Sequence, residues 1–132
     1  MRSLSEESTG MFDEKAGSEI IDGKEYVVLC VSNSYEKKFY LNPNFDNLPK
    51  KVKQELKAVC VIATTESGGI LLMEYDPEGN LLIRTEADEG DILFDEISAG
   101  LYVSKIQHEN RELLEELELY YKVFFLHQEI DP

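Results

Sequence analysis

The 132-residue chain contains no tryptophan, only two histidines and two cysteines, and far fewer basic than acidic residues. With 13 Lys and Arg against 27 Asp and Glu, its net charge is −14 at pH 7. Proteins that bind nucleic acids need Lys and Arg to neutralise phosphates, so this balance argues against a nucleic-acid partner. The same charge disfavours binding to an anionic membrane surface.

Long apolar segments are also missing. No run approaches the roughly 20 apolar residues that a membrane-spanning helix needs. The N-terminal segment, MRSLSEESTGMFDEKAGSE, contains no apolar core of the kind found in signal peptides. We therefore predict a cytoplasmic protein that does not bind membranes.

The few cysteines and histidines are not spaced as metal ligands. Cys30 and Cys60 lie in the apolar segments VVLCVS and AVCVIA, and His108 and His127 are isolated from each other. A structural zinc site needs about four Cys or His ligands, usually in closely spaced pairs. We predict that both cysteines are buried free thiols and that the chain carries no cofactor.

A chain of this length typically forms one domain. Residues 1–18 are polar, rich in Ser, Glu and Gly, and show no hydrophobic period. Such a segment cannot bury enough apolar surface to offset its ordering entropy. We predict a disordered acidic tail over 1–18 and a single α+β domain over 19–132.

Two pairs of short apolar segments predict two β-hairpins. EYVVLCVSN is followed by EKKFYLN across a polar turn, and ILLMEYD is followed by LLIRTEA across PEGN. Between the pairs, residues 49–65 carry apolar side chains at three- and four-residue spacing. This spacing is typical of an amphipathic helix, and Pro49 suits its first position.

The last third of the chain is predicted to be helical. ILFDEISAGL has helical spacing interrupted by Gly100, and a longer helix is predicted from about Lys105. The longer segment carries a heptad-like repeat formed by Ile106, Asn110, Leu113, Leu117, Tyr120 and Phe124. Asn110 either pairs across a parallel dimer or lies near the exposed helix start.

Taken together, the elements predict an α+β fold. Two β-hairpins form an antiparallel sheet that packs against two or three helices, in the order β-β-α-β-β-α-(α).

Six carboxylates crowd the segment EADEGDILFDE, residues 86–96. A calcium loop of the EF-hand type is excluded, because its fifth position falls on Gly90 and its sixth on Asp91. The segment instead suits a helix start with Asp88 as N-cap and acids near the positive end of the helix dipole. Two alternatives stay open: a weak Mg²⁺ or Mn²⁺ site formed by Asp88, Asp91 and Asp95, or a contact surface for a basic protein partner.

Three lysines, Lys50, Lys51 and Lys53, lie in the first turn of the helix predicted over 49–65. The helix dipole disfavours cations there. The lysines and the free N–H groups are therefore a candidate anion-binding site. The alternatives are plain solvation and pairing with acidic residues of the same or a neighbouring molecule.

No catalytic or nucleotide-binding motif is present, so the sequence favours a non-enzymatic role without excluding an enzymatic one. We predict a protein–protein interaction or regulatory module that acts as a homodimer. The predicted interface is the C-terminal helix, with Leu113, Leu117, Tyr120, Tyr121, Phe124 and Phe125. The alternative is a divalent-metal-dependent enzyme or small-ligand sensor that uses the carboxylates at 86–96.

Three segments carry a resemblance: NSYEKKFYLNPNFDNLPKKVKQEL, EADEGDILFDEISAG and ELYYKVFFL. Over about residues 24–127 the chain resembles a family of short uncharacterised proteins of clostridial gut bacteria. The resemblance implies a bacterial cytosolic protein. It implies no activity, cofactor or catalytic residue.

Overall fold

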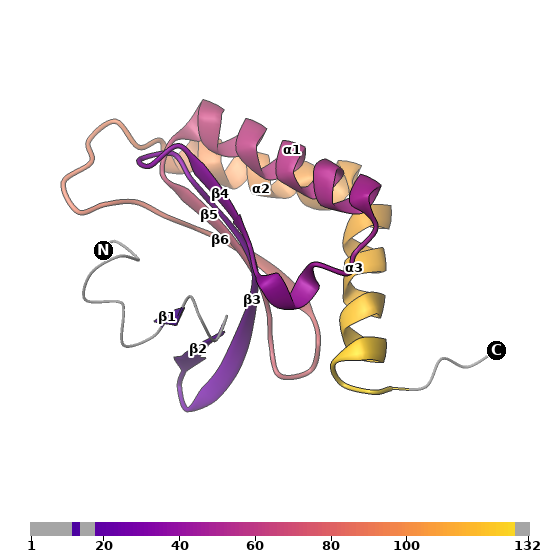
Figure 1. The fold of residues 1–132 in the computed structure, drawn as a ribbon. Helices are drawn as coiled ribbons and strands as arrows, with labels where there is room; N and C mark the ends of the chain where they lie inside the picture. The colour runs from indigo at the N-terminus through magenta and orange to yellow at the C-terminus, as the bar shows by residue number, and fades with distance from the viewer. Residues whose placement is uncertain (1–11, 14–17, 129–132) are drawn as a thin grey trace.

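The computed structural model describes residues 12–13 and 18–128. In these ranges six strands form one antiparallel sheet: β1 (Phe12–Asp13), β2 (Ser18–Ile21), β3 (Lys24–Asn33), β4 (Lys38–Leu41), β5 (Ile70–Tyr75) and β6 (Leu81–Glu86). The helices are the short 3-10 helix η2 (Pro43–Phe45), α1 (Lys50–Ser67), α2 (Glu96–Glu109) and α3 (Arg111–Phe124). The strand order is β1-β2-β3-β5-β6, and β4 also pairs with β3 (Figure 1).

Strand β3 is the centre of the sheet. Its first half, Lys24–Val27, pairs with β2, and its last four residues, Cys30–Asn33, pair with β4. Along its other side it pairs with β5, with a register shift between Val28 and Cys30. One ten-residue strand therefore holds three others in place.

Helices α1 and α2 lie side by side over one face of the sheet (Figure 1). The buried face of α1 includes Val52, Leu56 and Cys60, which join the core cluster that this layer forms with the sheet. The sulfur atoms of Cys30 and Cys60 are 3.9 Å apart, and both cysteines are buried free thiols, as predicted. Burial raises the pKa of the Cys30 thiol.

A cluster of stacked aromatic rings closes the end of the core where α3 packs. Phe45 from η2 is its centre, and its ring centroid lies 4.7 Å from that of Phe125 and 5.7 Å from that of Tyr75. Tyr75 stacks on Tyr121 at 4.0 Å, and its hydroxyl donates a hydrogen bond of 2.8 Å to the carbonyl of Leu117. These contacts fix α3 against the sheet.

The α+β class and the antiparallel sheet with helices are confirmed. The segment from Lys105, predicted as one helix, is divided between two helices. Its first residues form the end of α2, which runs from Glu96 to Glu109, and the rest forms α3, which begins at Arg111. Asn110 follows α2 as its C-cap and precedes α3 as its N-cap, and its N–H donates to the carbonyl of Ile106. The heptad-like spacing therefore does not mark one continuous helix.

The disordered tail predicted over 1–18 lies mostly outside the described residues. In the described part of that range, strand β1 (Phe12–Asp13) pairs with Ser18 and with the next residue, Glu19, at the start of β2. The sequence did not predict this pairing. In the part of the chain that the structure describes, no helix has the length and apolar character needed to span a membrane.

Candidate functional site

Strand β5 has two buried faces. Leu71, Met73 and Tyr75 belong to the core under the helices, whereas Ile70 and Leu72 form a second cluster with Val28 and Val31. Because side chains alternate along a strand, Glu74 lies on the same face as this second cluster. It is only 2% exposed, and a buried carboxylate needs partners.

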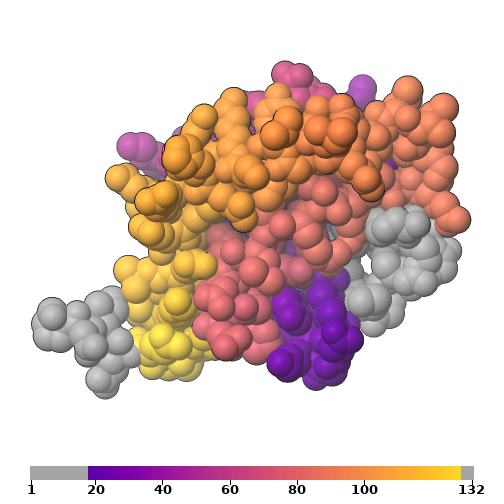
Figure 2. Space-filling view, turned by 180° about the vertical axis from the view of Figure 1, so that it is seen from behind, coloured from indigo at the N-terminus to yellow at the C-terminus, as the bar shows by residue number. Residues whose placement is uncertain are grey.

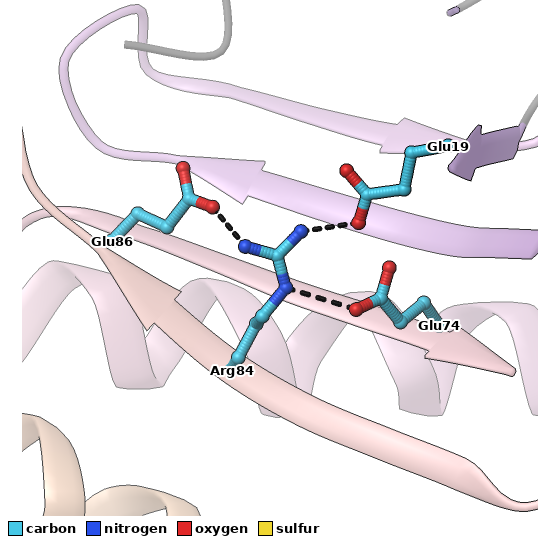
Figure 3. A network of polar contacts seen from close by, with 4 residues as sticks. All are labelled: Glu19, Glu74, Arg84 and Glu86. Carbon is cyan, nitrogen blue, oxygen red and sulfur yellow. Dashed lines mark hydrogen bonds and ion pairs between the residues drawn. The ribbon is translucent and has the colours of Figure 1, made fainter. Parts of the chain in front are cut away.

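Arg84 of β6 supplies them. Its Nε donates to Glu74 Oε1 at 2.9 Å, and its two terminal nitrogens bond Glu19 and Glu86 (Figure 3). Glu19 comes from β2, so its contact with Arg84 reaches over β3 and β5. We call these four residues the Arg84 network. It joins three strands through one guanidinium group.

One guanidinium cannot balance three carboxylates, so the network favours proton uptake. Burial and the hydrogen bond with Glu19 raise the pKa of Glu74 to about 8, although Arg84 acts to lower it. Burial also raises the pKa of Glu86, and Arg84 opposes that change. At neutral pH Glu74 therefore holds a proton beside a charged arginine.

This proton links stability to pH. The pKa of Glu74 in the folded chain lies above its usual value of 4.5. The contribution of the Glu74 proton to the free energy of unfolding is then fully present below about pH 4.5. This contribution decreases as the pH rises and is lost once the pH passes through about 8. The network stabilises the fold best in mild acid.

Residues 87–95 form an ordered loop between β6 and α2. The hydroxyl of Tyr35 donates to Asp91 and accepts from the N–H of Asp88 at 3.0 Å. At the end of the loop, Asp95 caps α2 by accepting from the N–H groups of Ile97 and Ser98. The loop is thus tied to the β3–β4 turn and to α2.

A contact at Gly69 fixes the loop 87–95 at a third point, in addition to the β3–β4 turn and α2. A Cβ atom added there would lie 2.5 Å from Cε1 of Phe94 and 2.6 Å from the carbonyl oxygen of Glu86. The φ angle of Gly69 is +72°, a conformation that side chains disfavour. The absence of a side chain at Gly69 lets the Phe94 ring pack against the start of β5.

We expect Gly69→Ala to destabilise the folded chain by about 2–3 kcal/mol, because it adds backbone strain and displaces Phe94. Chemical denaturation followed by circular dichroism measures this change. Gly100→Ala is the matched control, since that helical position is open and alanine there should be neutral or stabilising by up to about 1 kcal/mol. Equal stability of the Gly69→Ala variant and the wild type would contradict the packing role.

The anchored loop holds large apolar side chains in solvent. Ile92 is 93% exposed and Leu93 88%, while Ile97 and Leu101 on the first turns of α2 are 77% and 65% exposed. We call these four residues the loop surface. Ile92, Leu93 and Ile97 border a cavity of about 1060 Å³, and Figure 2 shows residues 87–95 projecting at the opposite end of the molecule from α3.

The three aspartates proposed as metal ligands have separate tasks. Asp91 bonds Tyr35, Asp95 caps α2, and Asp88 lies at the turn before them. No group of three His, Cys, Asp or Glu side chains in residues 12–13 and 18–128 is arranged to hold a metal ion. The predicted N-cap at Asp88 is wrong, because the N-cap of α2 is Asp95, seven residues later.

The proposed anion site at the start of α1 is an open surface. Lys50 and Lys51 are exposed, and Lys53 Nζ donates to the carbonyl of Asp46 at 2.9 Å. Pro49 precedes the helix and makes no side-chain cap. Whether these lysines bind an anion stays a prediction.

The six residues of the predicted interface divide between core and surface. Leu113, Leu117 and Tyr121 are buried in the chain's own core, and Tyr120 and Phe125 pack partly against it. Phe124 is 65% exposed. The apolar C-terminal helix is thus mainly a core helix, and an interface formed by its exposed residues stays a prediction.

One protein-family model covers most of this architecture, because it matches residues 26–129. The chain belongs to the DUF6145 family of unknown function. The DUF6145 match includes Glu74, Arg84 and Glu86 but begins after Glu19. No curated protein and no solved structure matches the chain.

Proposed function

We propose that this DUF6145 chain is a non-catalytic protein-interaction module. Its loop surface binds a basic, partly apolar segment of a partner protein. The proposal is carried by one observation: an ordered loop holds Ile92 and Leu93 almost fully in solvent. Burying each such side chain contributes about 1.5–3 kcal/mol, so a partner that covers them gains affinity.

The charge around the loop surface specifies the partner's chemistry. The cavity beside it is lined by Glu86, Asp88, Glu89, Asp91, Asp95 and Glu96, and by no Lys or Arg. A basic segment would pair with the exposed carboxylates among them, Glu89, Asp95 and Glu96, while its apolar side chains cover Ile92 and Leu93. Such complementarity raises the association rate and selects the partner.

A homodimer is the second candidate. The exposed side chain of Phe124, next to the partly buried Tyr120, favours it. Self-association through the loop surface is disfavoured, because two chains of net charge −14 would bring their acidic rims together. A homodimer would therefore form through α3, leaving the loop surface free.

The direct test uses a synthetic amphipathic peptide of about 18 residues with Leu and Lys at helical spacing. We expect the labelled peptide to bind in fluorescence anisotropy with a Kd in the micromolar range, and more weakly as salt rises. Ile92→Ser/Leu93→Ser should weaken binding at least about tenfold, since two apolar contacts are lost.

The control variant is Leu119→Ser, which removes an exposed leucine from α3 at the other end of the molecule. It should bind like the wild type. Equal binding by the Ile92/Leu93 variant, or by a peptide with Glu in place of Lys, would rule out the proposal. Light scattering on the same samples separates a 15.1 kDa monomer from a dimer of twice that mass and so tests the homodimer.

A further inference from the structure

A second cavity, of about 570 Å³, lies between the β3–β4 hairpin and the second half of α1. Its lining includes Lys37, Lys38 and Lys57 together with Ser32, Phe39 and Thr64. We call it the lysine pocket. Its volume lies within the range of about 300–1,000 Å³ that is usual for small-molecule sites.

The charge of the lysine pocket is opposite to that of the chain. Three of the 13 basic residues line it, and none of the 27 acidic residues does. Within the described part of the chain, the ammonium groups of Lys37, Lys38 and Lys57 form no ion pair. Unneutralised lysines at the border of one cavity attract an anion.

The remaining lining gives the pocket an apolar wall and a hydroxyl floor. Phe39 and Val61 face the cavity from β4 and α1. Ser32 and Thr64 also line the pocket, and their buried hydroxyls are 2.8 Å apart. The Thr64 hydroxyl also lies 3.2 Å from the carbonyl of Cys60. An inorganic ion would leave the apolar wall uncovered, whereas a ligand with an apolar body would cover it.

We propose that the lysine pocket binds a small organic anion, a molecule with one carboxylate, phosphate or sulfonate group and an apolar body. The acidic group lies beside Lys37 and Lys57. The apolar body lies against Phe39 and Val61. The site is separate from the loop surface, so its test is independent of the proposed protein partner.

The test titrates the full chain with phenyl phosphate, benzenesulfonate and hexanoate, followed by amide chemical shifts in NMR. We expect saturable binding with a Kd of about 1 mM or tighter for at least one of them. The shifts should concentrate at residues 32–39 and 57–68. Inorganic phosphate should bind at least about tenfold more weakly than phenyl phosphate.

Charge-matched variants locate the site. Lys57→Gln and Lys37→Gln should each weaken binding about three- to tenfold. Lys50→Gln changes the net charge equally but lies at the start of α1, outside the pocket, and should leave the Kd unchanged. All of these side chains are exposed, so the variants should fold.

Three results would overturn the proposal. The first is that none of the three organic anions binds with a Kd of about 1 mM or tighter. The second is equal weakening by Lys50→Gln, which would assign binding to the helix start or to overall charge. The third is inorganic phosphate binding as tightly as phenyl phosphate, which would show that the apolar wall is not used.

Discussion

Arg84→Met is expected to destabilise the folded chain by about 2–4 kcal/mol at pH 8 and by clearly less at pH 5. Removing the guanidinium leaves Glu19, Glu74 and Glu86 close together without a cation. At pH 8 folding of the variant must overcome their mutual repulsion or take up a proton at Glu74. At pH 5 that proton is readily taken up, because the pKa of Glu74 is about 8 even with Arg84 acting to lower it, and part of the repulsion is relieved. Urea denaturation at both pH values measures the difference.

Glu74→Gln is the control for this charge effect. It keeps a polar side chain of the same size and removes the titrating group. We expect the wild type to lose stability between about pH 4.5 and 8, and the Gln variant to lose less. Arg84→Met/Glu74→Gln should be more stable at pH 8 than Arg84→Met alone. A pH-independent effect of Arg84→Met would mean that lost packing, and not charge, explains it.

Phe45→Ala is expected to cost about 3–5 kcal/mol of folding free energy. The Phe45 side chain is fully buried and contacts four other aromatic rings, those of Tyr75, Tyr120, Tyr121 and Phe125. Truncation leaves a cavity where η2, β5 and α3 meet. Because Tyr120 and Tyr121 at the C-terminal end of α3 belong to this cluster, we also expect that end of the helix to lose its fixed packing, visible as weaker near-UV circular dichroism.

Phe124→Ala is the matched control, since it removes the same side chain from an exposed position of α3. Its effect should stay below about 1 kcal/mol. If the two variants were equally stable, the stacked cluster would not be the attachment of α3.

Local patterns in the sequence predict the elements well. The helix predicted over 49–65 appears as Lys50–Ser67, and the second hairpin appears as β5 and β6 around the turn at Asp76–Asn80. In each case the signal lies within neighbouring residues: apolar spacing for the helix, and turn residues for the hairpin. The order of β3, β4, α1, β5 and β6 follows from these signals.

Features formed between distant segments could not be predicted. Arg84 bonds Glu19 at a separation of 65 residues, and only tertiary geometry brings them together. The sequence held a weak signal for the Arg84 network, since Arg84 and Glu86 are two residues apart in a predicted strand and therefore lie on the same face. The true start of α2 was missed because several acids at 86–96 suit an N-cap, and the packing of Phe94 near Gly69 is a contact between distant segments that local patterns do not show.

The position of β3 between its neighbours has a consequence for how the chain opens. Strands β3 and β5 pair over residues separated by up to 48 positions, with α1 in the segment between them. Their amide protons should exchange with solvent only on global unfolding. Strand β4 has four residues, pairs only with β3 among the described strands, and can detach locally at lower cost. Since Lys38 and Phe39 lie on β4, such a fluctuation would widen the lysine pocket and admit a ligand while the rest of the sheet stays folded.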